Sequence, residues 1–105
     1  GLWAQVRLME AGGGLRAPGD SVVLSCHWTG LPNENYAVWW YRHPPGATLT
    51  WLSAMSYDST RIKYGPSVQG RANVSWDNSQ SKAFLSLLDL NHHDSAHYFC
   101  AVDTE

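Results

Sequence analysis

Short runs in which apolar and polar residues alternate recur along the chain, and clusters rich in Gly, Pro, Asn and Asp separate them. A period of two is typical of β-strands with one buried face, and such clusters mark turns. We expect one helical turn within Leu88–Ser95. Regularly spaced short strands favour an all-β sandwich of two sheets. The predicted strands are Gln5–Glu10, Ser21–Trp28, Ala37–Arg42, Leu49–Ala54, Ala72–Trp76, Ala83–Leu87 and His97–Val102.

The alternation also predicts which side chains face the core, because successive residues of a strand point to opposite faces of the sheet. In the last predicted strand, Tyr98 and Cys100 point inward and Phe99 points outward. The same argument directs a larger set of mostly apolar side chains inward: Val22, Leu24, Cys26, Val38, Trp40, Ala72, Val74, Trp76, Ala83, Leu85 and Leu87.

Length and charge narrow the class of protein. A chain of 105 residues fits one domain, and a net charge of -2 provides no basic surface for nucleic acid. No run of about 18 apolar residues is present, so we expect no membrane insertion by this segment. No Gly-x-Ser-x-Gly motif or comparable catalytic motif appears, and the Gly12–Gly14 run lacks the strand-to-helix setting of a phosphate loop. We therefore expect a binding protein without a cofactor rather than an enzyme.

Histidines near the C-terminal end raise the question of a metal site. His92, His93 and His97 lie close to Asp94 in the sequence. Because His92 and His93 are adjacent, we expect their side chains to diverge, and Asp94 has a better partner in Arg71. No metal site is expected.

The two cysteines, Cys26 and Cys100, are too far apart for the close pairs of a zinc ribbon. Two buried thiols and one structural disulfide both remain open on the cysteines alone. Three spacings around them are informative. Trp40 lies in the third predicted strand and Cys26 in the second, Tyr98 precedes Cys100 by two residues, and Asp94 precedes Tyr98 by four.

These residues, in this order, resemble antigen-receptor immunoglobulin variable (V-set) domains over nearly the whole chain. The segments Gly12–Leu15, Trp40–Gly46, Tyr64–Arg71 and Asp77–Ser79 are similar to immunoglobulin heavy-chain variable segments. Asp94–Val102 is closer to T-cell receptor alpha or delta variable segments. Heavy-chain-like segments used by delta T-cell receptors show this mixture.

The resemblance implies an inter-sheet disulfide between Cys26 and Cys100, with Trp40 packed on it and the Tyr98 hydroxyl bonded back to the backbone. It also implies an ion pair between Arg71 and Asp94. A disulfide requires an oxidising compartment. We expect an extracellular domain of a plasma-membrane receptor or of a secreted immunoglobulin.

Three loops at one end of a variable domain form its ligand-binding surface. The first is carried onto Thr29–Tyr36, with Asn33, Glu34, Asn35 and Tyr36 at its tip, and the second onto Met55–Arg61, with Tyr57, Asp58, Ser59 and Arg61. The third begins at Ala101 and includes Val102 and Asp103. Tyr, Ser and Asn suit a binding surface, although polar turns occur in every β protein. The implied ligand is a protein antigen or an antigen-presenting molecule.

A second surface follows from the alternation around Trp40. The opposite face of the same sheet carries a large apolar and aromatic set, and such sets usually mark an interface. In the family this face docks a second variable domain. The predicted partner interface consists of Trp39, Tyr41, His43, Leu49, Trp51 and Phe99.

Features near the two ends of the chain add further expectations. Residues 1–4 are interpreted as the end of a signal peptide or as a frayed terminus, with the domain over residues 5–105. The family's joining segment, which forms strand G, is missing after Val102, so we expect the last strand to have an unpaired edge. Two alternative functions follow: a non-rearranging V-set receptor, and a surrogate subunit completed by a partner's strand.

The segment Asn73-Val74-Ser75 matches the acceptor motif for N-linked glycosylation. In the predicted strand Ala72–Trp76, Asn73 lies on the opposite face from the inward Val74. We therefore expect Asn73 to point outward, where a glycan can be attached.

Overall fold

The computed structural model describes residues 16–28, 36–56, 58, 60–77 and 79–104, together with the backbone of residues 5–10; the side chains of residues 5–10, 103 and 104 are outside the description. Its elements are β1 (Gln5–Glu10), β2 (Val22–His27), β3 (Tyr36–His43), β4 (Thr50–Met55), β5 (Ile62–Tyr64), β6 (Ala72–Asp77), β7 (Lys82–Leu87), the 3₁₀ turn η1 (His92–Asp94) and β8 (His97–Thr104).

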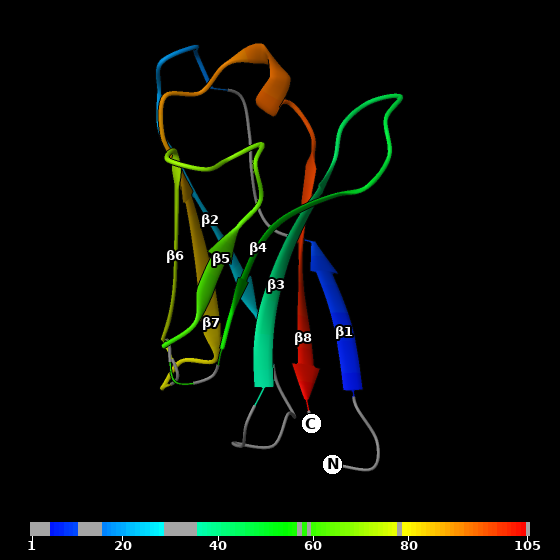
Figure 1. The fold of residues 1–105 in the computed structure, drawn as a ribbon, viewed down its shortest axis with the longest axis vertical. Coiled ribbons are helices and arrows are strands. Elements are labelled where there is room, and N and C mark those ends of the chain that lie inside the picture. Colours follow the sequence, from blue (N-terminus) through cyan, green and yellow to red (C-terminus); the bar gives the residue numbers. More distant parts are fainter. Residues whose placement is uncertain are drawn as a thin grey trace.

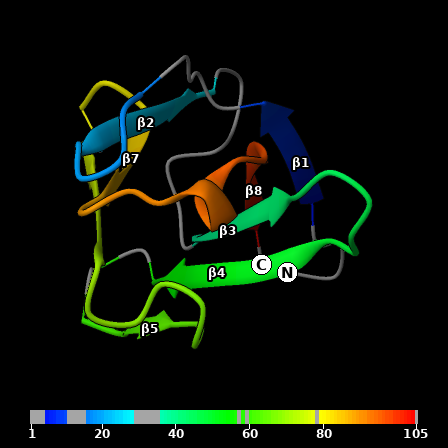
Figure 2. The same ribbon diagram turned by 90° about the horizontal axis from the view of Figure 1, so that it is seen from above.

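The strands form two antiparallel sheets that pack face to face. One sheet has five strands in the order β1-β8-β3-β4-β5, and the other has three in the order β2-β7-β6. Figure 1 shows the strands running along the long axis, and Figure 2, the view from above, separates the β3–β4 layer from the β2–β7 layer. This arrangement confirms the all-β two-sheet sandwich that the alternation predicts.

The core lies between the sheets and consists mainly of the residues that the alternation directs inward. Trp40 is fully buried and lies opposite Cys100 in the β3–β8 register. The Cys26–Cys100 disulfide joins β2 to β8, and therefore one sheet to the other, as the resemblance implies. A second group, Trp28, Tyr36 and Trp76, packs with ring centroids 5.0 to 6.4 Å apart.

The edge of β8 differs from the expectation. β1 pairs antiparallel with β8 from Gln5↔Thr104 to Glu10↔Phe99, so the expected unpaired edge is absent along this stretch. In variable-type sandwiches this position belongs to strand G, whereas strand A lies in the other sheet. Here the first strand of the chain takes the place of strand G and satisfies the backbone groups of β8.

Two further elements differ from the sequence-based expectation. The short strand β5 pairs with β4 from Ser53↔Tyr64 to Met55↔Ile62, and it was not predicted. β8 continues to Thr104, beyond the predicted end at Val102. By contrast, the helical turn expected within Leu88–Ser95 is present as η1.

We predict that reduction of the disulfide destabilises the domain. The bond closes a loop with a sequence separation of 74, and constraining so long a loop in the unfolded chain stabilises the fold by roughly 4 kcal/mol. Denaturant unfolding of the oxidised protein and of the Cys26→Ala/Cys100→Ala variant measures the difference. Coincident unfolding midpoints with equal slopes would show that the bond contributes nothing.

Candidate binding surfaces

The outward face of the five-stranded sheet carries a row of aromatic side chains. Tyr41 lies in the middle of this row, because its register partners are Phe99 on β8 and Trp51 on β4. In the next row Trp39 lies between the small residues Ala101 and Ala54. The four aromatic side chains are each half-buried. The structure therefore brings Trp39, Tyr41, Trp51 and Phe99 together on one face.

The two remaining residues of the predicted interface lie toward one end of this face. His43 is exposed and pairs in register with the exposed His97, whose ring stacks on Phe99 at a centroid distance of 6.4 Å. Leu49, directly before β4, is 54% exposed. All six predicted interface residues thus lie on or beside the same surface, which we call the aromatic face.

A β-bulge in β4 keeps Trp51 on the same side of the sheet as the rest of the aromatic face. The register passes from Trp40↔Ser53 to Tyr41↔Trp51, so Leu52 is the extra residue. Leu52 and Ser53 are both buried. The bulge thereby lets β4 direct two successive residues into the core and still present Trp51 outward.

Gly65 supports Trp51 from the neighbouring segment. Its N–H donates to the Leu52 carbonyl at 2.7 Å. A Cβ on Gly65 would lie 2.7 Å from the carbonyl oxygen of Trp51 and 3.2 Å from its ring. Only glycine permits this close approach, so the position of Trp51 depends on it.

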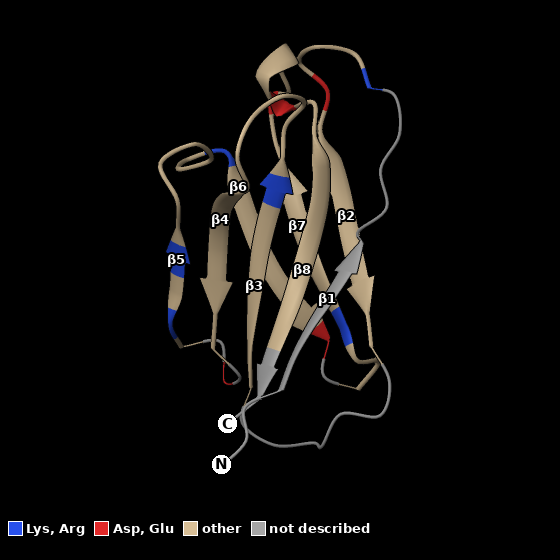
Figure 3. Ribbon diagram, turned by 90° about the vertical axis from the view of Figure 1, so that its right-hand side faces the viewer, with Lys and Arg blue, Asp and Glu red and all other residues tan. Residues whose placement is uncertain are grey.

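The aromatic face contains few charges. Neither β4 nor β8 between His97 and Val102 contains Asp, Glu, Lys or Arg, and Figure 3 shows both segments in tan. The one charged residue of β3, Arg42, is buried on the opposite side of the sheet. An apolar surface poor in charge costs little to desolvate when a partner covers it.

The strand ends that flank the predicted ligand-binding segments lie at one end of the sandwich. Figure 1 places the β4–β5 turn, the end of β2, the start of β3 and the end of β8 at the lower end, where the β6–β7 turn also lies. The turn η1 and the β3–β4 connection lie at the opposite end. Of the predicted contacts, Asn33, Glu34, Asn35, Tyr57 and Ser59 are outside the described residues, as is the side chain of Asp103.

The β4–β5 turn is held by its own hydrogen bonds. Oδ1 of Asp58 accepts from the Ser56 hydroxyl at 2.8 Å and from the hydroxyl and N–H of Thr60 at 2.6 and 3.1 Å. The hydroxyl and N–H of Thr60 and the hydroxyl of Ser56 together lower the pKa of Asp58 to about 2. Asp58 therefore fixes the shape of the turn, and the exposed Arg61 is the cation presented beside it.

Three of the predicted ligand contacts are placed differently by the structure. Tyr36 is 5% exposed, because it starts β3 and its ring packs between Trp28 and Trp76. Ala101 and Val102 are buried within β8, which is paired on both sides. The prediction that these three residues form the tip or start of a loop is therefore wrong.

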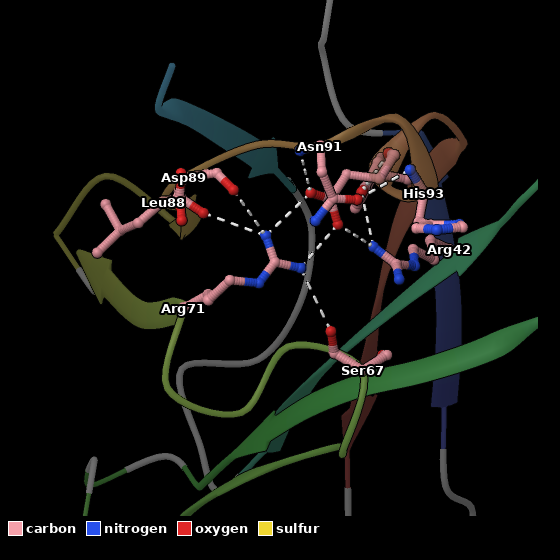
Figure 4. Close-up of polar contacts among 9 residues, drawn as sticks. Arg42, Ser67, Arg71, Leu88, Asp89, Asn91 and His93 are labelled. Atoms are coloured by element: carbon pink, nitrogen blue, oxygen red, sulfur yellow. Dashed lines mark hydrogen bonds and ion pairs between the residues drawn. The ribbon is translucent and has the colours of Figure 1, made fainter. Parts of the chain in front are cut away.

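A carboxylate at the opposite end joins the two sheets. Asp94 of η1 accepts from Arg71, which precedes β6, through Oδ1 at 2.8 Å and Oδ2 at 2.9 Å. Oδ1 also accepts from Nη1 of Arg42 on β3 at 2.9 Å, and Oδ2 accepts from the Asn91 N–H at 3.0 Å. Figure 4 shows Arg42 and Arg71 converging from different elements. The expected pair of Arg71 and Asp94 is present, and a second arginine joins it.

Arg42 was not predicted to have a role. It is buried two residues beyond Trp40, on the inward side of β3, and its Nη1 also donates to the Tyr98 hydroxyl at 3.1 Å. The Tyr98 hydroxyl in turn donates to the backbone carbonyl of Asp94 at 2.6 Å. The alternation along β3 directs position 42 inward, as it does Trp40. A prediction that looks for apolar residues does not select an arginine at such a position.

Next to this network, a hollow of about 430 Å³ opens between β2, β7 and η1. Its lining includes Val22, Leu24 and Leu87 from the strands, together with Asp94 and Tyr98. The oxygens of Asp94 and Tyr98 are already bonded to the two arginines, to Asn91 and to the backbone. The oxygens that Asp94 and Tyr98 contribute beside the hollow therefore already belong to the structural network.

The histidines of η1 differ from the expectation. The rings of His92 and His93 do not diverge but lie 3.9 Å apart between centroids. Within the described part of the chain, no three His, Cys, Asp or Glu residues are grouped closely enough to hold a metal ion. Among the same described residues, no helix is long and apolar enough to cross a membrane.

We predict that Asp94→Asn strongly destabilises the fold, because the buried Arg42 loses its carboxylate. Removing one partner of a buried ion pair costs about 3–5 kcal/mol of unfolding free energy. The matched control is Asp89→Asn, an exposed aspartate in the connection between β7 and η1, for which a change within about 0.5 kcal/mol is expected. Chemical denaturation of both variants measures the effect, and equal losses would contradict the role of Asp94.

Because the pKa of Asp94 is lowered in the folded protein, we predict that the domain loses stability in acid. Burial raises the pKa of Asp94, but hydrogen bonds from Arg71, the Asn91 N–H and Arg42 outweigh it and lower the pKa to about 2 from the ordinary 3.8. A group with a depressed folded-state pKa stabilises the fold above its ordinary pKa, and this contribution is lost as the pH falls through the folded value. Unfolding free energy should therefore fall between about pH 4 and pH 2, more steeply in the wild type than in Asp94→Asn. Parallel pH profiles would refute this.

A comparison with known protein families gives one match that spans most of the chain. The model described as Immunoglobulin V-set domain matches residues 15–105. The match includes both cysteines, the aromatic face and the arginine–aspartate network. Domains of this description typically bind other proteins and pair with partner domains, and the disulfide fits an extracellular domain.

Proposed function

Because the chain belongs to the immunoglobulin V-set family, we propose that it is an antigen-recognition variable domain of an adaptive immune receptor. It docks a second variable domain through the aromatic face. It binds a protein antigen or an antigen-presenting molecule through the predicted ligand-binding loops, whose flanking strand ends lie at the lower end of Figure 1. The receptor is of the T-cell receptor alpha or delta type or an immunoglobulin heavy chain, at the cell surface or secreted.

The aromatic face is the observation that carries this proposal. The row Phe99–Tyr41–Trp51 crosses three adjacent strands, and Trp39 stands in the next row between two alanines. Aromatic side chains are enriched among the residues that dominate binding energy at interfaces. Trp39 itself is half-buried, so part of its ring is available to a partner.

The alternatives receive less support. A surrogate subunit completed by a partner's strand requires an accessible edge on β8, but β1 already pairs with this edge from Glu10 to Gln5. A non-rearranging V-set receptor is compatible with the fold. The heavy-chain-like segments around Trp40–Gly46 and Tyr64–Arg71 favour the antigen-receptor assignment over it.

Binding of purified variable domains tests the proposal. The panel contains T-cell receptor beta and gamma and immunoglobulin light-chain variable domains, and the Kd of each for this chain is measured. We expect at least one class to bind, and the class that binds separates T-cell receptor from antibody usage. Absence of binding by every class would contradict docking of a second variable domain.

A matched pair of variants locates the interface. Tyr41→Ala removes the centre of the aromatic face, while Phe84→Ala removes a half-buried aromatic side chain from the central strand of the other sheet. We expect Tyr41→Ala to weaken binding about 30-fold, the effect of an aromatic hot spot, and Phe84→Ala to leave the Kd within about twofold. Similar losses for both variants would show that general destabilisation, rather than a lost contact, weakens binding.

A further inference from the structure

The outward face of the three-stranded sheet differs chemically from the aromatic face. One of its cross-strand rows consists of Asn73, Ser86 and Val23, and the next of Ser75, Phe84 and Ser25. Small hydroxyl and amide side chains surround a single aromatic ring. This face therefore presents small side chains and hydrogen-bonding groups instead of a row of aromatic side chains.

Asn73 is the residue on this face with the potential for covalent modification. Asn73 begins the segment Asn73-Val74-Ser75. This segment is the single match in the sequence to the acceptor motif for N-linked glycosylation. Asn73 and Ser75 are both exposed, whereas Val74 between them is buried. The pleat of β6 therefore presents the acceptor amide and its hydroxyl on the same outward side.

The backbone at this position is fixed independently of what Asn73 carries. The Val74 N–H donates to the Tyr64 hydroxyl at 3.0 Å, and Val74 pairs with Leu85 in the β6–β7 register. Both interactions lie on the inner side or along the edge of the strand. A large substituent on Asn73 can extend into solvent without displacing either of them.

We propose that Asn73 carries an N-linked glycan that covers the outward face of the β2–β7–β6 sheet. In this step Nδ2 of Asn73 attacks the anomeric carbon of a lipid-linked oligosaccharide. The bond from that carbon to the lipid pyrophosphate breaks, the pyrophosphate leaves, and the amide gives up one proton. No oxidant or reductant takes part.

Two features of the structure support this site. The Cys26–Cys100 disulfide forms in the same oxidising secretory compartment in which N-linked glycans are added. Val23, in the same cross-strand row as Asn73, is 64% exposed. A glycan on the edge strand β6 covers this apolar side chain and hinders edge-to-edge pairing of β6. It leaves the aromatic face, on the other sheet, available to a partner.

Secretion of the full chain from mammalian cells tests the proposal. Peptide-N-glycosidase F should reduce its mass and convert the modified asparagine to aspartate, which peptide mapping should locate at position 73. Asn73→Gln and Ser75→Ala should abolish the mass change, and Ser75→Thr, which preserves the motif, should retain it. A disulfide-bonded, secreted wild-type chain whose mass the enzyme does not change overturns the proposal. A change that persists in Asn73→Gln also overturns it.

The position of the glycan gives a second, independent readout. The Kd for a variable domain that binds the aromatic face should agree within about twofold between glycosylated and enzyme-treated protein, because the two faces lie on opposite sheets. A tenfold or greater gain in affinity after removal of the glycan would show that it extends over the aromatic face, contrary to the proposal.

Discussion

The alternation of side chains along β3 is the constraint on which the rest of the structure depends. Trp40 points inward and lies opposite Cys100 in the register, where the disulfide joins the sheets. Arg42 points inward two residues later and bonds to Asp94. Trp39 and Tyr41 lie on the opposite face. A shift of register by one residue would expose the core residues and bury the candidate interface at the same time, so stability and recognition constrain the same strand.

The residues that stabilise the sandwich and the residues predicted to bind ligand lie toward opposite ends of it. At one end, the arginine–aspartate network connects β3, the segment before β6, η1 and β8. At the other end are the β4–β5 turn and the ends of β2 and β8 (Figure 1). The network fixes the strands from the end that bears no predicted ligand contact. Sequence changes in the loops can therefore alter binding with little effect on the bonds that hold the sheets together.

Local patterns account for most of what the sequence could predict. Period-two alternation locates every strand except β5, and the resemblance that Cys26, Trp40, Tyr98 and Cys100 carry implies the disulfide. Long-range contacts explain the errors. Tyr36 has the composition of a binding loop, but it is buried because Trp28 and Trp76 from other segments pack against it. The pairing of β1 with β8 likewise joins residues at opposite ends of the sequence, which no local pattern reveals.

Hydroxyl-radical footprinting of the chain, alone and bound to a variable domain from the binding panel, tests the central claim most directly. Oxidation of Trp39, Tyr41, Trp51 and Phe99 should fall on binding, since these half-buried side chains form the proposed interface. Oxidation of Val23 and Phe84, on the outward face of the other sheet, should not change. Protection of Val23 and Phe84 with unchanged oxidation of the four aromatic residues would contradict the account.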